Sequence, residues 1–304
     1  MKKLVWPIII IGTAFGFLAI MWWLVAGTKP DVIYPSGQVG DHQQSLLMLT
    51  VLLSAAVVIP VFLMLGIFAW RYRDTNKKAK YKPEWQENVL LEAIWWGIPV
   101  IIITSLAIVT WFSSHSLDPH KAIVADKPPL KVQVVALQWK WLFIYPEEGI
   151  ATVNSLPLEV DRPVSFEVAA DAPMSAFWIP SLGSQIYAMN GMSTKLNLIP
   201  NKTGIFYGYN TNINGEGYSD MKFPVEVMPG DAFKKLSKKI ASSSMTLDYN
   251  HYEEIAKPSR DEPVHQMSLS DKGLYDKILM KYMDHGGHEA PASEDNSNHE
   301  GMEH

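Results

Sequence analysis

The sequence contains no cysteine among its 304 residues. This absence excludes disulfide bonds, zinc–thiolate sites and iron–sulfur clusters, because each of them requires cysteine sulfur. The chain also lacks a long basic run and carries a net charge of −5, so nucleic acid is not an expected partner. It lacks a nucleophile–base set, a glycine-rich phosphate loop and a pair of carboxylates of catalytic type. The class of protein must therefore be inferred from how the hydrophobic residues are distributed.

Three apolar runs in the first third of the chain are long enough to cross a bilayer, which takes roughly 20 residues. Pro60 and Pro99 lie inside the second and third runs, and transmembrane helices tolerate proline where neighbouring groups satisfy the freed carbonyl. The sequence therefore predicts a two-helix hairpin within residues 28–127, preceded by a further apolar segment in residues 1–27. The runs cover about Leu4 to Gly27, Leu46 to Trp70 and Ala93 to Phe112.

The orientation of the hairpin follows from the charges of its loops. The loop between the second and third runs is strongly basic, whereas the loop between the first and second runs contains only Lys29 as a strong base. The positive-inside rule places the basic loop in the cytoplasm. The large domain after Phe112 is then expected in the periplasm, or on the equivalent outer face, of a bacterial inner membrane. The basic residues are Arg71, Arg73, Lys77, Lys78, Lys80 and Lys82.

The first apolar run has two interpretations that the sequence leaves open. A basic start followed by an apolar stretch describes either a retained membrane anchor or a signal peptide that is cleaved near Gly27. Leu24 to Thr28 resembles a bacterial lipobox in which threonine replaces the lipidated cysteine. Without a thiol, no thioether-linked lipid can form at that position. The predicted topology of the rest of the chain is the same in both cases.

Residues 128–229 alternate between short apolar segments and turn residues, which is typical of an all-β domain. The intervening Asp171-Ala172-Pro173 and Asn214-Gly215-Glu216-Gly217 segments have turn chemistry. About 100 residues of regularly spaced strands predict a small Greek-key sandwich or barrel. The predicted strands are Lys131–Leu137, Trp139–Tyr145, Val164–Ala169, Lys195–Ile199, Ile205–Tyr209 and Phe223–Val227.

The composition changes again after this domain. Residues 230–283 are predicted to form a C-terminal helical arm, with short amphipathic helices at Ala232–Ile240 and Lys272–Met283. Residues 284–304 are polar and contain almost no apolar side chain, so we expect them to be disordered. Histidine-rich tails bind divalent metals weakly, and a solvated tail without a specific role is the alternative interpretation. The histidines of the tail are His285, His288, His299 and His304.

A metal-site spacing without its metal ligands lies between the last two predicted strands. Residues 208–221 read G-Y-N-T-N-I-N-G-E-G-Y-S-D-M. This pattern resembles the dinuclear copper loop of cytochrome c oxidase subunit II, G-x-C-x-x-x-C-x-x-x-H-x-x-M, in which only the methionine is kept here. Such a centre needs thiolates that bridge the two metals, so no metal is expected in this chain. By this resemblance, the six ligand positions are occupied by Ser175, Asn210, Asn212, Asn214, Tyr218 and Met221. We call these six positions the copper frame.

Further segments extend the resemblance over about residues 35–283. Glu92 to Trp96, Gln138 to Phe143, and Ile179 to Met189 are similar to subunit II of the cytochrome bo-type ubiquinol oxidases, which belong to the haem–copper oxidases. The resemblance implies a cupredoxin-like fold for the β-domain. A copper frame without copper implies that electrons enter the complex from quinol in the membrane and not from cytochrome c.

The resemblance therefore implies that the chain is subunit II of a proton-pumping terminal quinol oxidase. It implies no cofactor in this chain, with the haems and copper in subunit I, and further contacts with subunits III and IV and with membrane lipid. The similarity favours ubiquinol over menaquinol without deciding between them. A copper-containing cytochrome c oxidase subunit is excluded by the absence of cysteine. A membrane-tethered, cupredoxin-like binding or assembly protein remains the alternative.

Glu92, at the start of the third apolar run, is the candidate functional residue of the membrane part. A carboxylate at membrane depth is costly unless it faces protein or water, so it is a functional hypothesis by default. The resemblance implies proton uptake at the mouth of the K-type channel of subunit I. The alternative is a carboxylate that simply favours the start of a helix. Trp139 and Trp141 alternate on a predicted strand, and we expect them to pack, because no copper is present to receive an electron.

Overall fold

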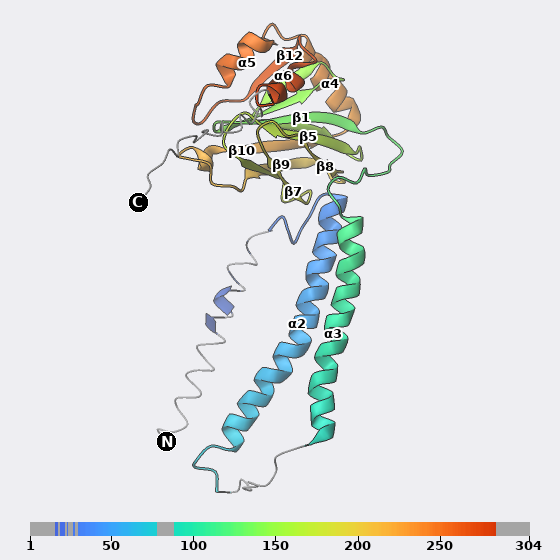
Figure 1. The fold of residues 1–304 in the computed structure, drawn as a ribbon, viewed down its shortest axis with the longest axis vertical. Coiled ribbons are helices and arrows are strands. Elements are labelled where there is room, and N and C mark those ends of the chain that lie inside the picture. The colour runs from blue at the N-terminus through green and yellow to red at the C-terminus, as the bar shows by residue number, and fades with distance from the viewer. Residues whose placement is uncertain are drawn as a thin grey trace, which may run out of the picture.

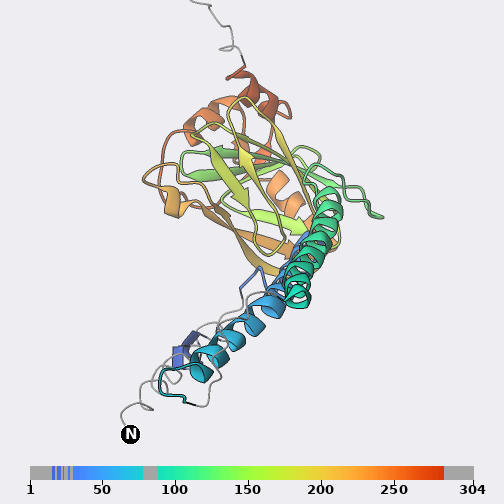
Figure 2. The same ribbon diagram turned by 60° about the horizontal axis from the view of Figure 1, so that its bottom comes forward.

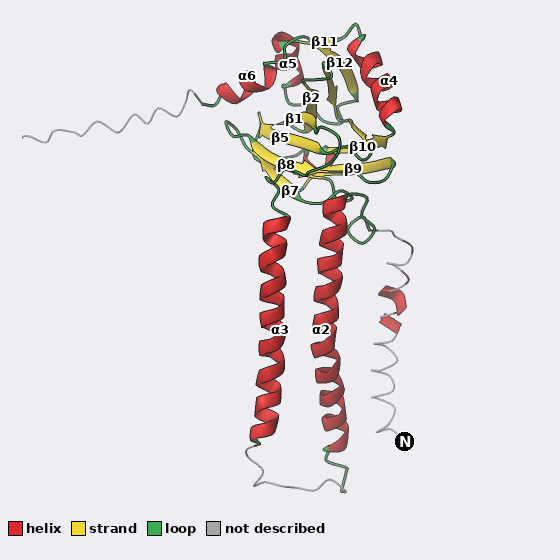
Figure 3. Ribbon diagram, turned by 90° about the vertical axis from the view of Figure 1, so that its right-hand side faces the viewer, coloured by secondary structure: helices red, strands yellow, loops and turns green. Residues whose placement is uncertain are grey.

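The computed structural model describes residues 30–77 and 88–283, together with a few positions between 16 and 27. Two long helices, α2 (Gln38–Arg71) and α3 (Val89–Ser116), run side by side and carry a β-rich domain at one end (Figures 1 and 3). Both helices are long and apolar enough to cross a membrane. The second and third predicted runs are thus confirmed as helices. The first run, with Thr28, lies almost entirely outside the described residues.

Both helices are longer than the apolar runs that predicted them. Helix α3 begins four residues earlier than expected, because the Asn88 side chain accepts a hydrogen bond from the Leu91 backbone N–H at 3.1 Å and caps the helix. Helix α2 begins eight residues earlier, where its first turn packs on the outer domain. The Gly40 N–H donates to the Leu182 carbonyl at 3.0 Å. A Cβ atom on Gly37 would lie 2.8 Å from that same oxygen, so glycine permits this close approach.

The outer domain is a sandwich of two sheets. A seven-stranded sheet in the order β11-β12-β3-β2-β1-β5-β8 faces a five-stranded sheet in the order β4-β10-β9-β6-β7. Strand β1 pairs antiparallel with β2 and parallel with β5, so the sheet is mixed. The strands are β1 (Leu130–Leu137), β2 (Lys140–Tyr145), β3 (Ile150–Val153), β4 (Leu156–Glu159), β5 (Val164–Ala170), β6 (Ser175–Trp178), β7 (Gln185–Ala188), β8 (Thr194–Leu198), β9 (Gly204–Asn210), β10 (Lys222–Met228), β11 (Thr246–Leu247) and β12 (His265–Leu269).

Aromatic side chains fill the space between the two sheets. Phe177 and Phe223 stack with ring centroids 5.7 Å apart, and Trp141 meets the edge of Phe177 at 5.4 Å. All three side chains are fully buried. Trp141 therefore packs in the core, as the sequence predicted. Together with the two membrane helices, this sandwich confirms the predicted fold class of a helical hairpin followed by a cupredoxin-like β-domain.

The C-terminal segment covers the outer face of the seven-stranded sheet. Helices α4 (Gly230–Ala241), α5 (Tyr249–Ile255) and α6 (Leu274–Met280) lie on the side of the domain away from the membrane helices (Figure 1). Helices α5 and α6 cover the outer face, whereas α4 packs Phe233 and Ile240 against the core between the sheets. The sequence predicted only helices here, whereas β12 pairs antiparallel with β3 and extends the sheet. A second apolar core forms beneath this segment, and the strands β1 and β2 are consequently buried on both faces.

The helix pair joins the domain near one flank and not beneath its centre (Figures 1 and 2). The five-stranded sheet is the layer nearer to the helices, so its outer face is turned toward the end of the domain from which the helices extend (Figures 1 and 3). Part of that face extends beyond the helices (Figure 1).

Candidate functional site

The structure brings together four of the six positions of the copper frame. The loop between β9 and β10 ends in a short 3-10 helix, Tyr218–Asp220, and folds back over the start of β6. The Asn214 amide donates to Ser175 Oγ at 2.9 Å and to Met221 Sδ at 3.3 Å. The Asn210 amide also donates to Met221 Sδ at 3.3 Å. The two residues at the cysteine positions are thus linked to the surviving methionine by hydrogen bonds.

The oxygen of Asn210 is also engaged. It accepts hydrogen bonds from the backbone N–H groups of Ala176, at 2.8 Å, and Asn212, at 3.0 Å. The Asn212 side chain points away from the frame and donates to the Met174 carbonyl at 2.7 Å. Tyr218, at the histidine position, is half-buried, and its hydroxyl makes no hydrogen bond with the described residues. The side chains of Asn212 and Tyr218 therefore do not join the cluster of Ser175, Asn210, Asn214 and Met221, although the Asn212 backbone contacts Asn210.

This donor set does not fit a dinuclear copper centre. Thiolates and an imidazole are replaced by neutral amide, hydroxyl and phenol groups, which are poor ligands for copper. The electron pair of an amide nitrogen is delocalised into its carbonyl group, and the amides of Asn210 and Asn214 direct their hydrogens at the Met221 sulfur, so neither nitrogen is a metal ligand. In the part of the chain that the structure describes, no three His, Asp or Glu side chains are grouped to hold a metal ion either.

Trp139 lies directly beneath the loop of this frame. Its backbone has φ of 95°, an uncommon conformation for a residue with a side chain. A Cβ atom on Gly217 would lie 2.4 Å from the indole ring, and one on Gly215 would lie 3.1 Å from it. Only glycines allow the loop to approach the ring this closely. Trp139 is therefore a packing platform for the loop, which agrees with the expectation that it packs.

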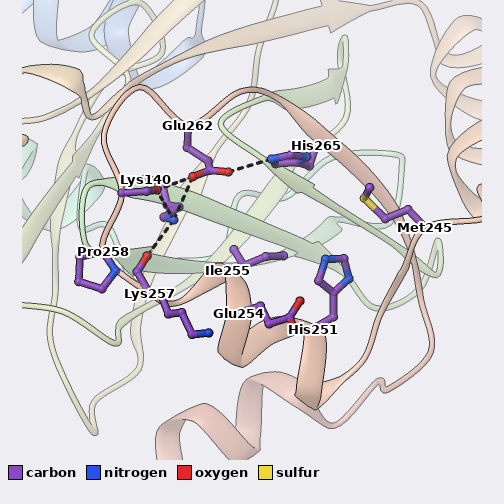
Figure 4. A pocket seen from close by; sticks show the side chains of 10 residues that line it. Lys140, Met245, His251, Glu254, Ile255, Lys257, Pro258, Glu262 and His265 are labelled. Atoms are coloured by element: carbon purple, nitrogen blue, oxygen red, sulfur yellow. Dashed lines mark hydrogen bonds and ion pairs between the residues drawn. The ribbon is translucent and has the colours of Figure 1, made fainter.

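A buried lysine next to Trp139 connects this region to the C-terminal segment. The Lys140 side chain is only 2% exposed. Its ammonium group donates to the carbonyl of Lys257 at 3.0 Å and to Ser259 Oγ, and it forms an ion pair with Glu262 at 3.3 Å (Figure 4). Glu262 also contacts His265 Nε2 at 3.0 Å. A buried ammonium group is stable only when it is paired and hydrogen-bonded in this way.

The carboxylate of this cluster has a strongly altered pKa. Hydrogen bonding from Ser259 and His265, together with Lys140, outweighs the effect of burial and lowers the pKa of Glu262 to about 2. The cluster forms one wall of a cavity of about 270 Å³ between α5 and the sheet (Figure 4). Sequence analysis missed Lys140, because a lysine between two tryptophans of a strand suggests a solvent-exposed position. No local pattern indicated that Lys140 is buried, because the residues that cover it, Lys257 to Glu262, lie far away in the sequence.

Asp171 is a second anchor that sequence analysis missed. Its side chain is only 4% exposed. The carboxylate accepts hydrogen bonds from the hydroxyls of Tyr252 and Tyr282 and forms an ion pair with Lys281 at 2.9 Å. Burial raises the pKa of this carboxyl, but the three donors outweigh burial and hold the pKa below its usual value. The turn after β5 is thereby tied to α5 and to the residues that follow α6.

Glu92 lies in the first turn of α3, at the end of the helix pair remote from the outer domain (Figure 3). Its side chain is exposed, and its backbone N–H donates to the Asn88 carbonyl at 3.0 Å. Of the predicted basic loop, Arg71 ends α2 at this same end, Arg73 and Lys77 follow it, and the remaining lysines lie outside the described residues. The copper frame and Glu92 are therefore at opposite ends of the molecule.

Two protein families match separate parts of the chain. The family described as cytochrome C oxidase subunit II, periplasmic domain, matches residues 149–228. The family described as the COX aromatic rich motif matches residues 241–286. The first region contains the copper frame, and the second contains strands β11 and β12 of the seven-stranded sheet and the helices α5 and α6 that cover it.

Curated relatives are similar over most of the chain. The cytochrome bo(3) ubiquinol oxidase subunit 2 of Pseudomonas putida is 42% identical over 95% of this chain and 94% of its own length. The ubiquinol oxidase subunit 2 of Acetobacter aceti is 43% identical over 85% of each chain. The quinol oxidase subunit 2 of Bacillus subtilis is 34% identical over 88% of this chain and 82% of its own length.

Proposed function

The chain belongs to the quinol oxidase subunit 2 family, and from this membership we propose how it works within its complex. It is subunit II of a terminal quinol oxidase, a membrane complex that couples quinol oxidation to the reduction of oxygen to water. In our proposal the complex pumps protons, lies in the bacterial inner membrane and holds this chain by its helix pair with the β-domain outside. The haems and copper belong to subunit I, and this subunit performs no redox step itself.

The observation that carries this proposal is the closed copper frame. Asn210 and Asn214 direct their amide hydrogens at Met221, so the frame offers no path for an electron through a metal. Electrons must then reach the oxygen-reducing centre without passing through this domain. A quinol that reacts within the membrane satisfies this requirement, whereas a soluble electron donor docked on the outer domain does not. Ubiquinol and menaquinol both fit.

The outer face of the five-stranded sheet is the surface that we assign to contact with subunit I. Along β9, Ile205 and Tyr207 point outward and are 68% and 49% exposed. Tyr187 of β7 is 48% exposed in the same sheet, and Trp178 of β6 is paired with Tyr209 of β9. Apolar and aromatic side chains that gather on a face turned toward the membrane mark an interaction surface. Subunit I is the partner that the membrane hairpin would bring beneath it.

The assignment is tested by copurification of the complex through this chain. The double substitution Ile205→Glu and Tyr207→Glu places two charges on the proposed interface, so haem recovered with the chain should fall at least severalfold. Ser242→Glu with Ser244→Glu adds the same charge on the opposite side of the domain and should leave haem recovery unchanged. The haem spectrum and extracted quinone of the wild-type complex identify the oxidase. Recovery of the wild-type chain alone, without haem, would contradict the proposed function.

We further propose that Glu92 collects protons on the cytoplasmic side for subunit I. It lies within the first turn of α3, next to the basic end of the helix pair, and a few residues at about 1.5 Å rise each keep it near cytoplasmic water. Glu92→Ala should slow quinol oxidation severalfold, because the ionisable group is lost. Glu92→Asp should retain more activity, because a shorter carboxylate remains.

Oxygen consumption of the purified complex, normalised to its haem content, measures this effect. Unchanged activity of Glu92→Ala would reduce the residue to a carboxylate that favours the start of the helix. Haem loss in parallel with activity would instead assign it to packing between subunits.

A further inference from the structure

Three methionines lie beside one another at the end of the sandwich that also carries the vacant copper frame. Met174 and Met192 are 46% and 54% exposed, although methionine is usually buried in folded proteins. Met189 is half-buried. The Asn212 side chain donates to the Met174 carbonyl at 2.7 Å, so the cluster borders the loop of the frame. None of these three residues belongs to the frame itself.

The backbone pairing places two of the side chains on one side of the chain. Met189 and Met192 are antiparallel bridge partners across the two-residue turn that follows β7. Gly191, the second residue of this turn, has φ of 67°, a conformation that glycine adopts without strain. Directly opposite residues of an antiparallel pair carry their side chains on the same face, with Cβ atoms about 4.5–5.5 Å apart.

The third methionine joins them through the pairing of β6 with β7. Ser175 and Ala188 are partners in this pairing, and both are buried. Their neighbours Met174 and Met189 occupy the next position of the same register, beyond the ends of the two strands. Because side chains alternate along a strand, these two methionines face away from the core. Met174, Met189 and Met192 thus form a row on the outer surface.

A row of thioethers has a defined metal preference. Thioether sulfur is a soft ligand that selects Cu⁺ among biological metals, and it carries no proton that must be lost. Methionine has several rotatable bonds, so three sulfurs on neighbouring backbone positions can converge on one ion. We propose that Met174, Met189 and Met192 bind a single Cu⁺ ion on the outer face of the domain.

The surroundings of the row do not oppose a monovalent cation. Tyr282 packs over the turn, since a Cβ atom on Gly191 would lie 3.2 Å from Tyr282 Cβ. The nearby Lys281 is already neutralised by its ion pair with Asp171 at 2.9 Å. Met221 is not available as a further ligand, because it is 1% exposed and its sulfur accepts two amide hydrogen bonds. This site is separate from the vacant frame. It continues the face of β7 that carries Tyr187, at the rim of the surface assigned to subunit I. Its access to solvent and the copper count of the complex therefore rest on the proposed function, which the haem content of the same preparation checks separately.

The test is a Cu⁺ titration of the complete purified complex, under anaerobic conditions with ascorbate and with bicinchoninate as the competing chelator. The wild-type complex should take up one equivalent of Cu⁺ beyond the copper that it already contains. Met174→Leu with Met192→Leu should weaken this binding at least tenfold, because leucine keeps the volume and removes the sulfur. Met245→Leu with Met280→Leu removes two other exposed thioethers and should leave the binding unchanged.

The pH dependence separates thioether ligands from histidines elsewhere in the chain. Histidine loses its metal affinity when it is protonated below about pH 6.5, whereas thioether binding persists. The additional equivalent should therefore remain at pH 5.5. Its loss at pH 5.5, equal binding by the two double variants, or the absence of additional Cu⁺ in the wild-type complex would each overturn the proposal.

Discussion

At the scale of single residues, hydrogen bonds take over the role that metal–ligand bonds have in a copper loop. The amides of Asn210 and Asn214 connect the end of β9 and the loop to Met221 at 3.3 Å each. A neutral hydrogen bond contributes only about 1 kcal/mol net, far less than a structural metal. The loop therefore also depends on its contact with Trp139 and on the ion pair of Asp220 with Arg260 at 2.9 Å.

Another residue-scale consequence concerns Glu262 and the buried Lys140. Because the pKa of Glu262 is lowered to about 2, its charge stabilises the fold fully above the ordinary pKa near 4.3. This stabilisation is lost as the pH falls from about 4 toward 2. Glu262→Gln lacks it at every pH, so the variant should be less stable at pH 7 by on the order of 2 kcal/mol. The difference should close near pH 2.

Denaturant unfolding of the outer domain within the full chain, followed by near-ultraviolet circular dichroism, measures this difference at pH 7, 4 and 2.5. Glu254→Gln is the matched control, since Glu254 is an exposed acid that lines the same cavity. A stability difference that is the same at pH 7 and pH 2.5 would assign the role of Glu262 to packing and not to charge.

At the scale of elements, the strands with strong apolar patterning were predicted well. The predicted Val164–Ala169 ends one residue before β5 does, and the predicted Phe223–Val227 is one residue shorter than β10 at each end. The four-residue strands β3, β4, β6 and β7 were missed, because each is too short for a periodic signal and is ordered by its partners. Strand β12 was missed for a related reason, since His265–Leu269 is ordered as a strand by pairing with β3 on one side and β11 on the other.

The candidate site was predictable in its sequence positions and not in its contacts. The spacing from Asn210 to Met221 located the frame, but it did not indicate that the side chains of Asn212 and Tyr218 lie outside the hydrogen-bonded cluster. Side-chain directions in a loop depend on the strand it covers, here the start of β6. For the same reason, no local pattern revealed Asp171 as the attachment point of residues more than 80 positions away.

The attachment at Asp171 gives an element-scale prediction. Asp171→Asn removes the charge that Lys281 and the hydroxyls of Tyr252 and Tyr282 share, leaving a buried set of donors only partly satisfied. The loss should be about 2–3 kcal/mol, and α5 and α6 should become more sensitive to protease. Limited proteolysis with peptide mapping measures this. Asp276→Asn, at an exposed position of α6, should leave the cleavage pattern unchanged. Equal protection of Asp171→Asn and wild type would show that apolar packing alone holds these helices.

At the scale of the whole molecule, the chain is a stack of layers along the direction of the helix pair (Figures 1 and 3). The helix pair comes first, then the five-stranded sheet, the seven-stranded sheet and finally the covering helices. Each sheet is apolar on the face it shares with the next layer. The seven-stranded sheet is apolar on both faces, which is unusual for a mostly antiparallel sheet and follows from its outer cover. The C-terminal helices are thus required to shield the apolar outer face of the seven-stranded sheet from water.

This dependence gives the last prediction, which concerns removal of residues 230–304. The deletion uncovers the fully buried side chains of the outer face of the seven-stranded sheet, a patch far more apolar than a soluble surface carries. The shortened chain should aggregate or fail to assemble, giving little haem-containing complex in size-exclusion chromatography. Deletion of residues 284–304 alone removes only the polar tail and should leave assembly and activity unchanged. Normal assembly after the longer deletion would mean that another subunit covers this face, and that the C-terminal segment is not its obligatory partner. The exposed residues would be Val135, Leu137, Leu142, Ile144 and Ala169.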